Sequence, residues 1–182
     1  MASPKALEDL FLVTLKDIYY AEKQILKALP KMARAAESKE LREAFEKHRD
    51  QTEEQIARLE RVFELIDKRA QGKSCEAIVG IIDESKEIME EFSNSPALDA
   101  GLIASGQAVE HYEISRYGTL RAWAQQLGLK EGAALLEETL QEEIDTDELL
   151  SDIAQRTANA VAEGGAARTS GSAGRGQRAA QA

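Results

Sequence analysis

The chain has 182 residues, of which 43% are hydrophobic, 31% are charged and 5% are aromatic, and it contains three prolines. This length and apolar content fit one ordinary domain with a substantial core, and the composition is typical of helices whose outer faces carry charged side chains. The formal net charge of -10 argues against a nucleic-acid-binding body, because such proteins present clustered positive charge.

Cysteine usage and hydropathy bear on the cellular compartment. Cys75 is the single cysteine, so an internal disulfide is excluded. The first residues lack the basic-then-apolar pattern of a secretory signal, and no apolar run approaches the roughly 20 residues that cross a bilayer. We therefore expect a soluble cytoplasmic protein with no membrane partner.

The first half of the chain predicts two long helices. Ser3 and Pro4 form a capping serine followed by proline, which predicts a helix that runs to about residue 36 with a kink at Pro30. Ser38 is expected to cap a second helix that continues to about residue 68. The polar residues 71–74 then separate this helix from the next element.

The second half predicts one short and two long helices. The short helix is expected from about residue 75 to 92. Residues 93–96 repeat the serine-proline start, and the helix that follows ends near Gly128, since glycine suits the left-handed conformation at a helix end. The last helix is expected over about 130–160. These elements predict an all-α four-helix bundle with a short extra helix in the crossover between the second and third long helices.

After Ala162 the composition changes to Gly, Ala, Ser and Arg without apolar periodicity. This change divides the chain into a helical bundle at 1–162 and a tail at 163–182 that we expect to be disordered. The tail has three arginines and one glutamate, so its net charge is +2, and residues 1–162 carry the remaining -12. Two roles remain for the tail: it contacts nucleic acid or a partner, or it is a solubilising extension.

Each long helix shows an apolar stripe at alternating steps of three and four residues, and every stripe turns polar halfway along. When the helices are folded into antiparallel pairs, these interruptions fall at matching depths and form one layer. The interrupting residues are Glu22, His48, Thr52, Gln55, Glu110, Glu113, Glu143 and Asp147.

Acids that face one another in a buried layer need compensation, because an unpaired buried carboxylate costs several kcal/mol or stays protonated. A shared cation is the simplest compensation, and helical bundles hold di-iron and di-manganese centres in this way. Oxygen-rich ligation favours iron or manganese over zinc. Two interpretations remain for each of three further residues. His48 is either a metal ligand or a core histidine, and His111 either supports the ligands or lies on the surface. Tyr117 is either a hydrogen-bond donor or electron relay, or a packing residue.

Several motifs make the chain resemble the YciE/YciF family of ferritin-like bacterial stress proteins over about residues 5–155. The motifs are Leu7-Glu-Asp-Leu-Phe11, Tyr20-Ala-Glu-Lys-Gln-Ile25, Ala28-Leu-Pro-Lys-Met32, Glu110-His-Tyr-Glu-Ile114, Tyr117-Gly-Thr-Leu120 and Glu138-Thr-Leu140. The resemblance implies a ferritin-like bundle, a rubrerythrin-type dinuclear metal site, a stress setting and a homodimer. The ligands that it implies are Glu22, Glu110, Glu113, Glu143, His48 and Asp147.

The second helix departs from the usual ligand pattern of such sites. It offers His48, Thr52 and Gln55 where a standard site has Glu-x-x-His, and the last helix has no histidine. The departure predicts a site that holds one metal tightly and a second loosely, or that activates oxygen poorly.

Two classes of function follow from the sequence. The first is a cytoplasmic stress-response protein whose dinuclear iron or manganese site oxidises Fe(II) or consumes peroxide. The second is a non-catalytic helical scaffold with a vestigial site, and a nucleic-acid protector acting through the tail is a further alternative. A second apolar stripe on the third long helix favours the scaffold, and it consists of Leu98, Leu102, Val109, Tyr112 and Trp123.

Overall fold

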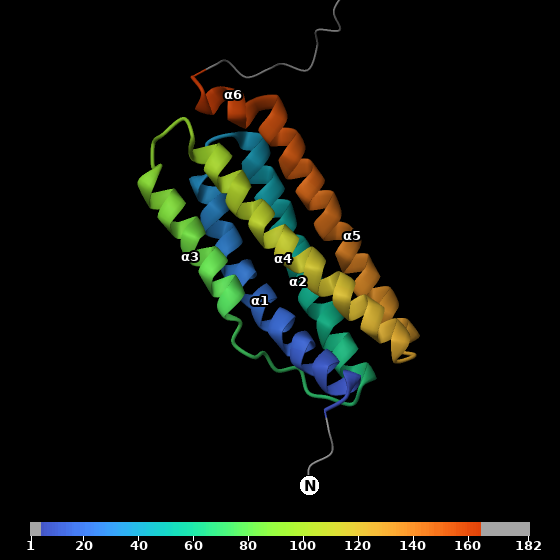
Figure 1. Ribbon diagram of the computed structural model, residues 1–182. Helices are drawn as coiled ribbons and strands as arrows, with labels where there is room; N and C mark the ends of the chain where they lie inside the picture. Colours follow the sequence, from blue (N-terminus) through green and yellow to red (C-terminus); the bar gives the residue numbers. More distant parts are fainter. Residues whose placement is uncertain (1–4, 165–182) are drawn as a thin grey trace, which may run out of the picture.

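The computed structural model describes residues 5–164, and its regular elements are all helical (Figure 1). The expectations for Ser3, for Pro4 and for residues 165–182 lie outside this range. In chain order the helices are α1 (Leu7–Ala35), α2 (Lys39–Leu65), α3 (Glu76–Glu91), α4 (Leu98–Gln126), α5 (Lys130–Ile153), the π-helical turn η1 (Ala154–Ala158) and α6 (Asn159–Ala162).

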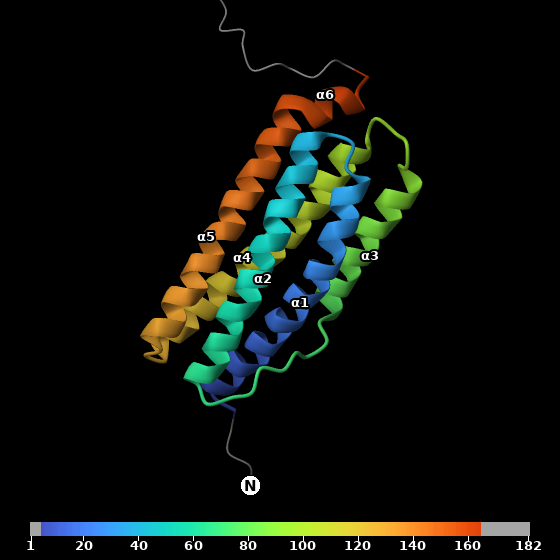
Figure 2. The same cartoon turned by 180° about the vertical axis from the view of Figure 1, so that it is seen from behind.

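Four long helices form the bundle. α1 packs on α2 and α4, and α5 packs on α2 and α4, so each helix runs antiparallel to its two neighbours (Figures 1 and 2). α3 lies outside this ring against α1 and α4, within the crossover that returns the chain from the end of α2 to the start of α4. The predicted four-helix bundle with a short helix in the crossover is confirmed, and a single long crossover is the connection of ferritin-like folds.

Two helix boundaries that depend on local chemistry are confirmed. Ser38 caps α2, because its hydroxyl oxygen accepts a hydrogen bond from the amide of Leu41 at 3.2 Å. Gly128 follows the end of α4 with φ +74°, a conformation that glycine adopts without steric cost.

Three other boundaries differ from the prediction. α2 ends at Leu65 rather than near Lys68, because Asp67 takes a left-handed backbone conformation with φ 53°. α4 begins at Leu98, since residues 95–98 form a turn in which the amide of Leu98 donates to the carbonyl of Ser95 at 3.0 Å. The predicted single helix over 130–160 instead changes to a π-helical turn at Ala154–Ala158.

The segment between α2 and α3 lies closely on α1. The amide of Lys73 donates to the carbonyl of Lys16 at 3.0 Å. A Cβ added at Gly72 would lie 3.1 Å from Cβ of Tyr20, so this glycine permits the close approach. The segment ends at Cys75, whose side chain is buried, as free cysteines commonly are. These contacts fix where α3 starts beside α1.

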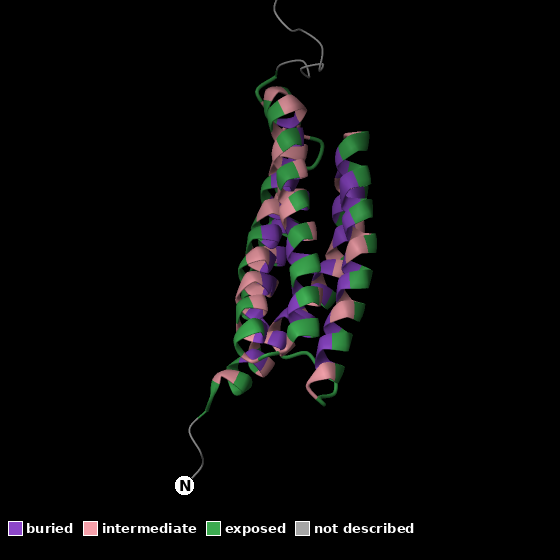
Figure 3. Ribbon diagram, turned by 90° about the vertical axis from the view of Figure 1, so that its right-hand side faces the viewer, coloured by how far each residue is buried: buried purple, intermediate pink, exposed green. Residues whose placement is uncertain are grey.

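Buried residues face the interior of the bundle and exposed residues face outward (Figure 3). On α1 the buried stripe has Leu15 and Ile18 on one side of Glu22, and Ile25 and Leu29 on the other. The polar layer therefore lies between two apolar sections of the core.

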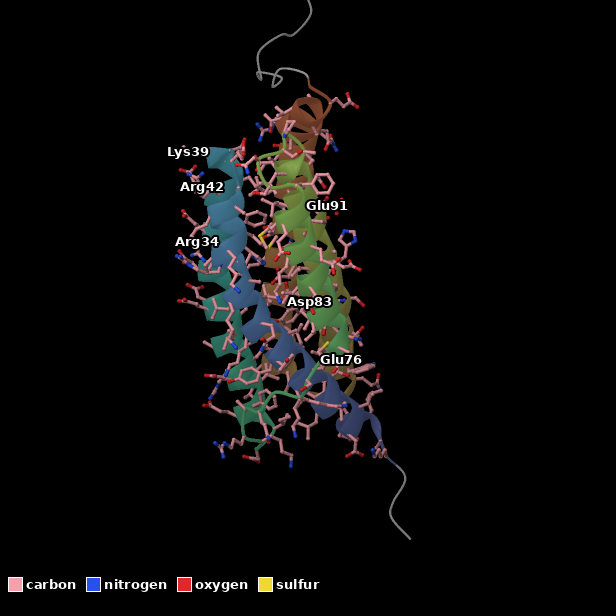
Figure 4. The ribbon with its side chains drawn as sticks, turned by 90° about the vertical axis from the view of Figure 1, so that its left-hand side faces the viewer. Arg34, Lys39, Arg42, Glu76, Asp83 and Glu91 are labelled. Atoms are coloured by element: carbon pink, nitrogen blue, oxygen red, sulfur yellow. The ribbon has the colours of Figure 1, made fainter. Side chains whose placement is uncertain are left out.

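Charged side chains cover the outside, where Arg34, Lys39 and Arg42 lie along α1 and α2 and where Glu76 and Asp83 lie along α3 (Figure 4). Within residues 5–164, no helix combines the length and the apolar character that crossing a lipid bilayer requires.

Candidate metal centre

Four of the predicted ligands come together midway along the bundle. They are His48 on α2, Glu110 and Glu113 on α4, and Glu143 on α5, and one ligand atom from each lies within 4.8 Å of the others. His48 Nε2 is 3.2 Å from Glu110 Oε1 and 3.7 Å from Glu143 Oε2. These atoms are close enough to share a cation. All four side chains are buried, so the cation would be held away from bulk water.

α1 contributes Glu22, which is fully buried. The hydroxyl of Tyr117 donates a hydrogen bond to Glu22 Oε1, and Glu22 Oε2 has no hydrogen-bond partner among the described residues. Tyr117 follows Glu113 by one turn on α4 and is itself fully buried, so it both packs in the core and orients Glu22. Glu22 thus presents one free oxygen to the interior.

Burial controls the protonation of the layer. It raises the pKa of Glu22 to about 7 and that of Glu110 to about 8. Burial also raises the pKa of Glu113 and of Glu143 well above the usual range, and the neighbouring carboxylates act in the same direction.

His48 responds to burial in the opposite sense, and its pKa falls to about 4. Both His48 and Glu110 therefore favour their neutral forms near neutral pH, although their side chains are only 3.2 Å apart. Their contact is therefore a close approach of two neutral groups rather than an ion pair, and the metal-free layer is largely uncharged.

The unpartnered atoms of the layer test whether a metal fits. A buried polar atom without a partner costs about 1–3 kcal/mol, and native proteins contain few of them. Carboxylates with one imidazole form a donor set that suits iron and manganese. The layer's atoms without a hydrogen-bond partner within residues 5–164 are Glu22 Oε2, His48 Nδ1 and Nε2, Gln55 Oε1, Glu110 Oε2, both carboxyl oxygens of Glu113 and both of Glu143. The residues present therefore fit a buried metal site.

Asp147 is not brought into this cluster. One of its carboxyl oxygens accepts from Gln107 Nε2 at 3.0 Å, and the other lies 3.2 Å from Nε2 of His111, whose side chain is 68% exposed. The next buried residue of α5 after Glu143 is Thr146, three residues later. Asp147 follows Glu143 by four residues and therefore lies at the edge of the buried stripe.

Glu142 and Arg58 lie beside the layer and were not predicted. Glu142 accepts hydrogen bonds from Gln55 Nε2 at 3.0 Å and from both terminal nitrogens of Arg58, at 2.7 and 2.8 Å. The sequence does carry signs of this group, because Arg58 follows Gln55 by three residues and Glu142 precedes a stripe acid. Neither lies on an apolar stripe, so an interruption of a stripe marks neither of them.

The amino-acid sequence matches a protein family and a curated relative. Residues 6–163 match the family described as a domain of unknown function, DUF892. Protein YciF of Escherichia coli is 44% identical over 160 residues, which are 87% of this chain and 96% of YciF.

Solved structures agree with the sequence comparison. The crystal structure of the E. coli stress protein YciF matches with a TM-score of 0.81 and 42% identity, over 88% of this chain and 99% of that chain. The Rhodopseudomonas palustris protein YcfI, described as a candidate structural protein, matches with a TM-score of 0.79 and 44% identity, over 81% and 94% of the two chains.

Proposed function

The chain belongs to the DUF892 family, and we propose that it is a YciF-like stress protein that holds two iron or manganese ions in its buried carboxylate layer. The observation that carries this proposal is the set of unpartnered donor atoms on four different helices at one depth of the core. Protein interiors rarely leave such atoms without a partner, and shared cations give one to the carboxylate oxygens and to one nitrogen of His48.

Each side chain has a role in this proposal. His48, Glu110, Glu113 and Glu143 surround one position, and Glu22 extends the donor set toward α1. Four carboxylates supply four negative charges, which balance two divalent ions beside a neutral imidazole. Bound iron or manganese supplies the electron-transfer chemistry that oxidises Fe(II) or reduces peroxide. Tyr117 holds a proton against Glu22 Oε1, and the surrounding apolar side chains exclude water from the layer.

The cellular setting belongs to the same proposal. We place the protein in the cytoplasm as a homodimer, on the resemblance to YciF-like proteins. The body is acidic, so contact with nucleic acid is assigned only to the arginines of residues 163–182.

Metal analysis of the native protein tests the proposal. Protein from iron- and manganese-replete cells is expected to carry more than one metal ion per chain, and Fe(II) is expected to drive oxygen uptake. The double variant Glu110→Gln/Glu113→Gln removes two charged donors, whereas Glu148→Gln changes an exposed acid of the same bundle and serves as control. A content below about half an ion per chain, unchanged by the double variant, contradicts the proposal.

A non-catalytic scaffold is the second candidate, and the description of the R. palustris relative favours it. The second apolar stripe does not support it further, because α3 packs on α4 and Leu98, Leu102 and Val109 are buried. The double variant separates a metal-free scaffold from a metalloprotein. In a metal-free scaffold it raises the thermal stability of the protein by removing buried carboxyls, and added metal changes nothing. In a metalloprotein it abolishes stabilisation by metal.

A further inference from the structure

We propose that Gln55 is a neutral oxygen ligand of the metal layer, and that Glu142 and Arg58 orient its amide. The proposal rests on the proposed metal site and adds the ligand that α2 supplies where a standard site has Glu-x-x-His. It assigns to Gln55 the second of the two ion positions.

The orientation of the Gln55 amide follows from its hydrogen bond. The side chain is fully buried, and Nε2 donates to Glu142 Oε2 at 3.0 Å. An ionised carboxylate only accepts hydrogen bonds, so the amide turns its nitrogen toward Glu142 and its oxygen away from it. That oxygen, Oε1, is buried and has no hydrogen-bond partner in the described part of the chain. A metal ion is a partner that a bare amide oxygen can take.

Glu142 is held firmly in turn. Arg58 donates from Nη1 to Oε2 at 2.7 Å and from Nη2 to Oε1 at 2.8 Å, which is the two-pronged geometry that guanidinium and carboxylate groups favour. The side chains are 14% and 22% exposed, so solvent screens the pair only in part. Glu142 directly precedes Glu143 on α5, and Gln55 lies on the buried stripe of α2 that also contains His48. The relay from Arg58 through Glu142 to Gln55 thus lies beside the layer, between α2 and α5.

No other buried side chain of α2 offers an oxygen without a hydrogen-bond partner. The hydroxyl of Thr52 donates to the carbonyl of His48 at 2.9 Å, within its own helix. His48 lies two turns before Gln55 on the same buried stripe. α2 therefore presents one nitrogen donor and one amide oxygen to the layer.

A neutral ligand suits the charge of this site. Amide oxygens are hard donors, which manganese and ferrous iron accept. The four buried glutamates already balance two divalent ions, so a fifth carboxylate would add uncompensated negative charge. Gln55 instead completes the coordination at constant charge.

Titration of the metal-free full-length chain with Mn²⁺ in a calorimeter tests the proposal. Gln55→Met keeps a side chain of similar length without a hard oxygen, and Glu142→Gln removes the charge that pairs with Arg58 and replaces one of the two acceptor oxygens behind the amide with an N–H donor. Glu138→Gln is the matched control, because Glu138 also accepts from Arg58, at 2.8 Å, but has no hydrogen bond to Gln55. We expect two ions per unmodified chain, second-ion affinity lowered at least tenfold in Gln55→Met and about 10- to 100-fold in Glu142→Gln, and no change in Glu138→Gln.

Each outcome decides a separate point. Equal binding by Gln55→Met and the unmodified chain overturns the proposal while the metal site stands. If the unmodified chain binds no Mn²⁺ or Fe²⁺, the proposed function itself fails. If Gln55→Met loses its helical circular dichroism, the comparison of Glu142→Gln with Glu138→Gln decides, and identical second-ion affinities in these two variants overturn the assigned orientation.

Discussion

The free energy of unfolding of the metal-free protein is expected to fall as the pH rises from about 5 to 8. Burial raises the pKa of Glu22 to about 7 and that of Glu110 to about 8, whereas both groups ionise near 4.5 in the unfolded chain. Between these values the folded protein binds more protons than the unfolded chain. The contribution of these carboxyls to the free energy of unfolding is therefore fully present below pH 4.5, and it is lost as the pH rises toward the pKa of the folded state.

The magnitude follows from the width of the interval. One pH unit within it costs about 1.4 kcal/mol for each such carboxyl, so Glu22 alone accounts for roughly 3 kcal/mol by the time its folded pKa is passed. Glu113 and Glu143 act in the same direction. His48 opposes them, since its pKa falls from 6.5 to about 4 and it destabilises the fold as the pH drops through that range. One histidine faces four carboxyls, so the carboxyls set the net direction.

Urea denaturation of chelator-treated protein at several pH values, followed by circular dichroism, measures this effect. Total stabilities of small domains are about 5–15 kcal/mol, so a change of roughly 3 kcal/mol is easily resolved. Saturating Mn²⁺ is expected to reverse the slope, because the ligands must then be deprotonated in the folded state. Metal-free protein whose stability stays constant or rises between about pH 5 and 8 would refute a protonated layer.

Three further predictions concern the layer and its supports. Near pH 6, metal binding is expected to release about two protons per ion, measured with a pH indicator, and a release near zero contradicts carboxyls held protonated. Tyr117→Phe removes the donor to Glu22 and is expected to lower the free energy of unfolding by about 1–3 kcal/mol; an unchanged denaturation midpoint argues against that hydrogen bond. Gly106→Ala places a Cβ 3.0 Å from Leu150 Cδ1 and is expected to destabilise the protein by roughly 1 kcal/mol. Gly118→Ala on the same helix places its Cβ in open space and is expected to stabilise the protein by about 0.5–1 kcal/mol. Thermal melts that rank the two variants in the other order disprove the packing argument.

The elements of the bundle were predictable because their causes are local. Apolar side chains at helical spacing mark the buried face, Ser38 supplies an oxygen to the first turn of α2, and Gly128 allows a left-handed residue after α4. The sequence contains each of these causes within a few residues of the feature it explains. Four of the six predicted ligands come together for the same reason, since His48, Glu110, Glu113 and Glu143 interrupt the stripes that the bundle buries.

The features that escaped prediction depend on contacts between distant segments. Arg156 lies in the π-helical turn and donates to Glu40 on α2 at 2.5 Å as well as to Asp152 at 2.7 Å. The pair formed by Arg58 and Glu142 joins α2 to α5 in the same way. Helical periodicity predicted Asp147, four residues after Glu143, as the next residue of the stripe, but packing of the helices buries Thr146, three residues after Glu143, instead.

If the proposed metal site is correct, the layer couples metal content to the stability of the whole bundle, because all four long helices contribute to it. Without metal, the fold keeps these carboxyls protonated at a cost that grows with pH. With metal, the same groups become ligands that tie α1, α2, α4 and α5 together. Even a role carried out by the outer surface would then depend on the metal, since the arrangement of that surface is only as stable as the layer beneath it. The enzyme and the scaffold therefore differ in whether bound metal turns over substrate, and stability alone does not separate them once metal is found to bind.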